Sequence, residues 1–155
     1  MEIERKFLVK QVPISHHMCN KMKLLQGYIS LDPALRLRSS GDKYIFTFKS
    51  GQGLSREEFE SVLTKEQFDN LWVLVSGNNI EKDRYNIPLE NDLIAELDIY
   101  HGRLAGFATV EVEFSSIDQA NAFNPPDWFG EDVTDDIRYS NSSLSQELPP
   151  SFIPS

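Results

Sequence analysis

Alternation of apolar and polar residues recurs along most of the chain and predicts strands rather than helices. Successive side chains of a strand point to opposite faces of a sheet, so an apolar residue at every second position marks a face that can be buried. Eight segments show this pattern: residues 1–10, 23–31, 34–40, 43–50, 55–63, 79–89, 93–100 and 108–115. Eight short strands in one chain are typical of a barrel or a sandwich.

Short turn signals separate several of these strands. Ser40-Gly41-Asp42, Gly51-Gln52-Gly53 and Glu90-Asn91-Asp92 supply the Gly, Asn and Asp residues that tight turns favour. Strands joined by such turns are antiparallel, and we therefore expect an antiparallel sheet.

Two segments predict helices instead. Thr64 and Gln67 have the spacing of a capping box, and Gly77 is expected to end the helix that follows. A shorter helix is expected over residues 116–123, before two prolines. Both are amphipathic and should pack against the outside of the sheet. The apolar stripe of the longer helix is Phe68, Leu71, Trp72 and Val75.

Composition places the chain among globular proteins. Its 155 residues are 40% hydrophobic and 25% charged, and no run approaches the roughly 20 apolar residues of a membrane helix. We expect one domain over residues 1–146 with a Pro- and Ser-rich tail over residues 147–155. The charged start MEIERKF lacks a secretory pattern, which favours the cytoplasm, and Cys19 is the single cysteine, which excludes an intrachain disulfide.

The net charge of -9 opposes binding to extended polyanions. Nucleic acid and anionic membranes are therefore not expected as partners. A small anionic ligand is not excluded, because the local placement of Arg and Lys decides what a cleft attracts.

Pairs of charged residues recur on one face of seven predicted strands. Ordinary solvated faces mix Ser, Thr, Gln and Lys, whereas these positions are almost wholly Arg, Lys, Glu and Asp. Any single pair is explained by a solvated outer face of an amphipathic sheet. Together they favour a functional face. The charged positions are Glu2, Glu4, Lys6, Arg36, Arg38, Lys49, Arg56, Glu58, Glu60, Lys82, Arg84, Glu96, Asp98, Glu111 and Glu113.

A closed barrel would place this charged face inside. The two amphipathic helices need an apolar surface, which puts the apolar face outside and the charged face in the interior. Buried charge is costly unless it meets opposite charge, metal or ligand. The sequence thus predicts a mainly β (α+β) fold, an eight-stranded antiparallel closed β-barrel with a charged interior and helices packed outside.

The residue types in that interior indicate its chemistry. Converging Arg and Lys side chains match the oxygens of a condensed phosphate chain. Paired carboxylates are the natural ligands of a hard divalent cation, Mg²⁺ or Mn²⁺, which would bridge the acidic groups to the phosphate. Hydrolysis of a phosphoanhydride is the simplest reaction for such a site.

The run Glu2-Ile3-Glu4-Arg5-Lys6 resembles the ExExK signature of the CYTH family, the triphosphate tunnel metalloenzymes. The other charged pairs follow in that family's order, so the resemblance covers nearly the whole chain. It implies an eight-stranded triphosphate tunnel, and it is nearest to the compact bacterial inorganic triphosphatases.

The resemblance also implies roles for individual residues. The triphosphate would be bound by Lys6, Arg36, Arg38, Lys49, Arg56 and Arg84, with Arg138 as a secondary candidate ahead of Tyr139-Ser140-Asn141. The metal would be held by Glu2, Glu4, Glu111 and Glu113. Further acidic positions of the tunnel would be Glu58, Glu60, Glu96 and Asp98.

Lys82 resembles the lysine proposed in related bacterial members to activate the attacking water, with Tyr28 as a helper. The alternatives are that Lys82 is a further phosphate contact and that Tyr28 is an ordinary wall residue. The pair His16-His17 lies outside the matched positions and is expected in a surface loop.

Several activities fit the same tunnel. Hydrolysis of inorganic triphosphate is favoured by the compact length and by the lack of a base-recognition element. The alternatives are a class IV adenylyl cyclase, which converts ATP to cyclic AMP and pyrophosphate, a hydrolase of another organic triphosphate, and a binding module without turnover. The choice of metal and a homodimeric state stay open.

Overall fold

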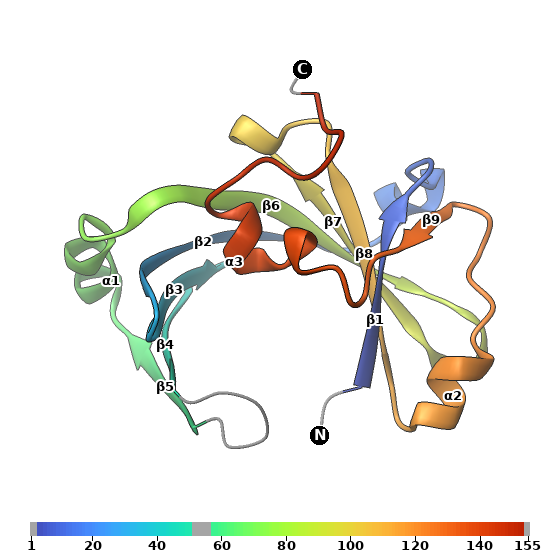
Figure 1. The fold of residues 1–155 in the computed structure, drawn as a ribbon, viewed down its shortest axis with the longest axis horizontal. Helices are drawn as coiled ribbons and strands as arrows, with labels where there is room; N and C mark the ends of the chain where they lie inside the picture. The colour runs from blue at the N-terminus through green and yellow to red at the C-terminus, as the bar shows by residue number, and fades with distance from the viewer. Residues whose placement is uncertain (1–2, 51–56, 154–155) are drawn as a thin grey trace. The chain divides into compact units, whose positions relative to one another are not determined.

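Nine strands form one mainly antiparallel sheet in the computed structural model, which describes residues 3–50 and 57–153 (Figure 1). The hydrogen-bonded order is β5-β4-β3-β2-β6-β7-β8-β1-β9. The strands are β1 (Ile3–Val9), β2 (Lys21–Leu31), β3 (Ala34–Ser40), β4 (Lys43–Ser50), β5 (Glu57–Leu63), β6 (Ser76–Pro88), β7 (Ile94–Tyr100), β8 (Ala108–Phe114) and β9 (Phe129–Asp132).

Helices are few and short. The α-helices are α1 (Lys65–Trp72), α2 (Ile117–Ala122) and α3 (Asn141–Leu144), and the 3-10 turns are η1 (Ile14–Met18), η3 (Glu90–Asp92), η4 (Gly102–Leu104) and η5 (Ile137–Tyr139). Within the described residues, no helix has the length and apolarity to cross a membrane.

All eight predicted strands have a counterpart, and two of them, β3 and β4, have the predicted bounds. The predicted count of eight is one too low, because β9 adds to β1 through the pairs Phe7 with Asp132 and Val9 with Phe129. Its four residues, FGED, are too few to show an alternating pattern.

Two of the predicted turns can be checked. Gly41 links β3 to β4 with a φ of 62°, a conformation that Gly adopts without strain. The turn at Glu90-Asn91-Asp92 is the 3-10 turn η3, and Asn91 has a φ of 60°. The Gly51-Gln52-Gly53 turn lies outside the described residues. His16-His17 lies in η1 rather than in an irregular loop, with the two rings 3.9 Å apart.

The chain packs as two compact units. Of the described residues, the first unit contains 3–22 and 83–137, and the second contains 23–50, 57–82 and 138–153. Strands β2 and β6 each contribute residues to both units.

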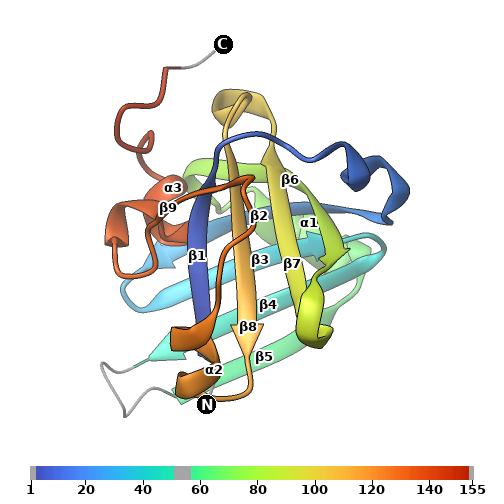
Figure 2. The same cartoon turned by 90° about the vertical axis from the view of Figure 1, so that its right-hand side faces the viewer.

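In the first unit, one face of the sheet is apolar and covered. The register pairs Phe7 with Val110 and Leu97 with Val110, so these side chains share a face. Helix α2 packs on β1 and β8, with Ala120 in the same buried cluster (Figure 2). Glu4, Lys6, Glu96, Asp98, Glu111 and Glu113 therefore occupy the opposite face, as the alternation predicts, and Arg5 is the charged residue of these strands that shares the face of Phe7.

Strand β9 is tied to β1 by an ion pair as well as by the backbone. Arg5 Nε and Nη2 donate to Asp132 Oδ2 at 3.2 and 2.9 Å. Burial alone would raise the pKa of Asp132, but hydrogen bonds from Thr134 and Arg5 outweigh it and lower that pKa. The Arg5 guanidinium also lies 4.9 Å from the centre of the Phe7 ring.

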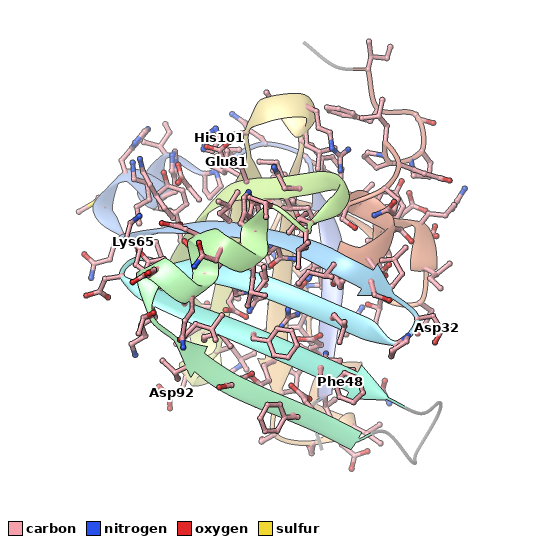
Figure 3. All side chains as sticks on the ribbon, turned by 90° about the vertical axis from the view of Figure 1, so that its left-hand side faces the viewer. Asp32, Phe48, Lys65, Glu81, Asp92 and His101 are labelled. Carbon is pink, nitrogen blue, oxygen red and sulfur yellow. The ribbon has the colours of Figure 1, made fainter. Side chains whose placement is uncertain are left out.

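In the second unit, α1 covers the apolar face of β3, β4 and β5. Phe68 of α1 is buried and its ring lies 5.1 Å from that of Tyr44. Figure 3 shows Phe48 on the face of the sheet that carries α1. Burying a side chain such as Phe68 contributes roughly 2 kcal/mol, far more than the helix propensity of an eight-residue segment.

Helix α1 has the predicted start but not the predicted end. The capping box between Thr64 and Gln67 is formed in both directions. The helix stops at Trp72 instead of Gly77, because the amides of Leu74 and Val75 bond to carbonyls three residues back and tighten the last turn. Ser76 then already belongs to β6.

Gly27 of β2 allows α1 and its C-terminal turn to approach the sheet closely. A Cβ atom on Gly27 would lie 2.6 Å from Val75 Cγ1 and 3.1 Å from the Trp72 ring. Neither side chain can move away without an energetic cost. The Val75 side chain is short, and the Trp72 ring packs against the Phe68 ring with their centres 5.3 Å apart.

We expect Gly27→Ala to lower the free energy of unfolding by about 1–3 kcal/mol through overpacking. Chemical denaturation measures the loss. In a Val75→Ala background the clashing methyl is absent, and the same substitution should cost less. Equal losses in both backgrounds would place the strain elsewhere.

Candidate active site

In the first unit, charged residues of β1, β6, β7 and β8 lie on the face of the sheet opposite α2. The register places Glu4 opposite Glu113, Lys6 opposite Glu111 and Glu96 opposite Glu111. Lys6 Nζ lies 3.7 Å from Glu111 Oε1. This face therefore combines several carboxylates with the Lys6 ammonium, and β1, β7 and β8 carry their predicted charged residues on it.

Arg84 and Asp98 form the tightest ion pair of this face. Arg84 Nε and Nη2 donate to the two Asp98 oxygens at 2.8 and 3.0 Å, and Nη1 lies 3.3 Å from Glu96 Oε2. Burial alone would lower the pKa of Arg84, but its bonds to Asp98 and the nearby Glu96 and Glu111 charges outweigh burial and raise that pKa. Arg84 is thus fixed in position and permanently charged.

A neutral hydrogen-bonded pair lies beside Asp98. The hydroxyls of Tyr100 and Thr109 are 3.2 Å apart and both residues are fully buried. Burial, followed by the Asp98 charge, raises the pKa of Tyr100. The Tyr100 hydroxyl therefore stays protonated.

Glu4 and Glu113 are the carboxylates best placed to share a cation. They are direct cross-strand partners on one face, an arrangement that repels unless a positive charge lies between them. Carboxylate oxygens suit a hard divalent ion, so the residues fit such a metal. Among residues 3–50 and 57–153, however, no group of three or more acidic, His or Cys side chains is close enough to form a complete metal site. Glu2, the fourth predicted ligand, lies outside the described residues.

The second unit carries a basic face on β3 and β4. Arg36 is paired with Thr47, and Lys49 with Glu58, so these residues share the face opposite α1. Tyr28 is opposite Arg36 and Gln26 is opposite Arg38. Arg38 Nε donates to Gln26 Oε1 at 3.0 Å. Glu60, opposite Thr47, extends this face onto β5.

Buried polar atoms without a hydrogen-bond partner cluster on this basic face. Within the described part of the chain they include Gln26 Nε2, Arg36 Nε and Thr47 Oγ1. Gln26 and Thr47 are 0% and 1% exposed. A buried polar atom without a hydrogen bond is energetically costly. Several such atoms on one face are typical of a site that holds a polar ligand.

The remaining predicted residues are placed as follows. Lys82 is 1% exposed and lies two residues before Arg84, on the same face of β6. Arg138 is exposed on η5, outside the strands. Arg56 lies outside the described residues.

A cavity of about 810 Å³ in the first unit is lined by Ile87, Phe123 and Trp128, among others, and by no predicted site residue. The cavity therefore lies beside the apolar core cluster of the first unit and not on the charged face of the sheet.

Comparison with known proteins identifies the family of this chain. The CYTH domain matches residues 1–143. The chain belongs to the CYTH family. The family expectation drawn from the ExExK signature and the ordered charged pairs is thereby confirmed.

Two curated CYTH relatives are similar over nearly their whole length. An inorganic triphosphatase of Nitrosomonas europaea is 44% identical over 151 residues, which are 96% of this chain and 99% of the relative. An inorganic triphosphatase of Acetivibrio thermocellus is 35% identical over 147 residues, covering 92% of each chain.

Solved structures agree on the CYTH fold. The crystal structure of an inorganic triphosphatase has a TM-score of 0.81 and 43% identity, covering 96% of this chain and 97% of that one. A putative adenylyl cyclase from Hippeastrum has a TM-score of 0.55 and 16% identity, covering 78% of this chain and 83% of that one. The second likeness concerns the fold alone.

Gln26 and Thr47 were not among the predicted site residues. A signal existed, because Gln26 has the same strand parity as Tyr28, and Thr47 the same parity as Lys49. The site residues were chosen for their charge, and Gln26 and Thr47 are uncharged.

We expect Asp98→Asn to lower the free energy of unfolding by about 3 kcal/mol, because Arg84 would lose the carboxylate that neutralises it in a buried place. Urea denaturation measures this loss. Glu96→Gln is the matched control, since the Glu96 side chain is 34% exposed against 2% for Asp98. It should cost about 1 kcal/mol or less. Comparable losses in the two variants would contradict a dominant Arg84–Asp98 pair.

Proposed function

We propose that this CYTH protein hydrolyses inorganic triphosphate to pyrophosphate and phosphate. The observation that carries the proposal is 44% identity, over 96% of the chain, to an inorganic triphosphatase. The second curated relative has the same activity in its name. The basic face of the second unit supplies cationic donors suited to a phosphate chain.

In this proposal, cationic side chains bind the substrate. The triphosphate contacts are Lys6, Arg36, Arg38, Lys49, Arg56 and Arg84, with Arg138 as a secondary contact. The bonds from Arg84 to Asp98 support a positioned guanidinium, and the bond from Arg38 to Gln26 supports another. Glu58, Glu60, Glu96 and Asp98 balance the positive charge.

Glu2, Glu4, Glu111 and Glu113 would hold Mg²⁺ or Mn²⁺. The opposed pair of Glu4 and Glu113 supports this assignment. The metal, when bound, would draw charge from the phosphoryl oxygens and so favour attack by water. The carboxylates themselves fix its position relative to the substrate.

Lys82 is our candidate for accepting the proton of the attacking water, with Tyr28 as a helper. A lysine accepts a proton only in its neutral form, and the alternative is that Lys82 is one more phosphate contact. Its near-complete burial supports a role on the inner charged face rather than in solvent.

Closure of the sheet into a tunnel also belongs to the proposal and is supported by membership of the CYTH family. We propose that its domain spans residues 1–146, followed by a tail over residues 147–155. The family match over residues 1–143 is compatible with that limit.

We expect the purified protein to release phosphate from inorganic triphosphate when Mg²⁺ or Mn²⁺ is present, and to stop when EDTA removes the metal. Phosphate release measures turnover, and ATP run in parallel separates the alternatives through its products. Cyclic AMP with pyrophosphate from ATP, without use of triphosphate, would replace the proposal by a cyclase. Binding of triphosphate without turnover would replace it by a binding module.

Glu113→Gln should lower triphosphate turnover by at least about 100-fold, because losing a metal ligand exceeds the roughly 10–100-fold cost of losing an outer-shell partner. The same variant should unfold at equal or higher denaturant concentration, since it relieves repulsion with Glu4. Glu66→Gln in the first turn of α1 is the control, because this exposed carboxylate lies on the helix that covers the apolar face, and the variant should leave turnover unchanged. Full activity of Glu113→Gln would remove Glu113 from the metal site.

A further inference from the structure

The orientation of the Gln26 amide is fixed by its neighbour. Arg38 Nε can only donate, so the group 3.0 Å away must be the amide oxygen of Gln26. The amide nitrogen Nε2 is consequently directed elsewhere, and it is buried with no partner among the described residues. A fully buried amide donor is thus held in place with its hydrogen-bonding capacity unused.

Two further buried groups on the same face share this property. Thr47 Oγ1 and Arg36 Nε have no hydrogen-bond partner in the described part of the chain, and the two residues face each other across β3 and β4. Gln26 lies opposite Arg38, two residues from the pair of Tyr28 and Arg36 and on the same face. Three donors therefore lie on three neighbouring strands, β2, β3 and β4.

A ligand that satisfies three donors must supply several acceptor oxygens. The surrounding Arg36, Arg38 and Lys49 are cationic, so the ligand is anionic. A phosphoryl group meets both conditions, because its oxygens carry negative charge and accept several hydrogen bonds each. Hydrogen bonds between neutral donors and a charged acceptor are stronger than neutral pairs, which offsets the cost of burying the donors.

We propose that Gln26 and Thr47 are uncharged substrate-binding residues that donate to phosphoryl oxygens alongside Arg36. Gln26 also positions Arg38 through its amide oxygen, so a single side chain links a cationic contact to a neutral one. This inference rests on the proposed hydrolysis of inorganic triphosphate and adds the neutral part of the binding site to it.

Substitutions at Thr47 test the hydroxyl with little change of shape. Thr47→Val removes the donor and should raise the KM for inorganic triphosphate about 10-fold, and Thr47→Ser, which keeps the hydroxyl, should stay near the native value. Thr47→Val should not lower the melting temperature of the ligand-free protein, because the hydroxyl has no internal partner to lose. A structural role predicts the opposite, a lower melting temperature with an unchanged KM.

Gln26→Glu tests the amide nitrogen. A carboxylate still accepts the Arg38 bond but presents negative charge in place of the donor, so the KM should rise by more than about 10-fold while the fold is kept. An unchanged KM would show that no phosphoryl oxygen lies beside Gln26. Ser145→Ala is the control, because Ser145 is equally buried but bonds to the Ser142 carbonyl at 2.6 Å, and its KM should not change.

Calorimetric titration with inorganic triphosphate in EDTA separates this inference from the function on which it rests. Weaker binding by Thr47→Val and Gln26→Glu supports the inference whether or not the native protein turns the compound over. Native turnover together with native affinity in both variants would overturn the inference and leave the proposed function standing.

Discussion

The pleat of the strands is the constraint on which the structure depends. Most strands carry apolar residues at one parity and charged residues at the other, so forming the sheet separates most of them onto two faces. In the first unit Phe7, Leu97 and Val110 lie under α2 on one side, with Lys6 and Glu111 on the other. A shift of one residue in any strand would bring charges into the apolar cluster, which strongly specifies the register.

Charges concentrated on one face must be neutralised locally. The first unit does so with ion pairs, above all the two short bonds between Arg84 and Asp98. The second unit has a surplus of cations and buried donors that residues 23–50 and 57–82 do not fully satisfy, as Gln26 and Thr47 show. Under the proposed function, the carboxylates of the first face would hold the metal and the donors of the second face would bind the anion.

The strand pattern and the helix starts were predictable because both follow from local periodicity and local hydrogen bonds. The capping box of Thr64 and Gln67 is an example, since its partners lie three residues apart. The end of α1 at Trp72 was not predictable, because the tightened turn that ends it lies where Val75 and Trp72 approach Gly27 of a distant strand. Strand β9 was not predicted for a similar reason. Its partner β1 is more than a hundred residues away in the sequence, and its own four residues show no alternating pattern.

The sequence by itself determined the antiparallel strands, the separation of charged from apolar faces, and the residues that resemble CYTH site positions, because strand parity and residue order require no tertiary contacts. Only the tertiary structure decided which charges meet. It pairs Arg84 with Asp98, sets Glu4 opposite Glu113, and holds the Gln26 amide by Arg38 with one donor left over. Such choices depend on cross-strand register and burial, which arise when segments distant along the chain come into contact.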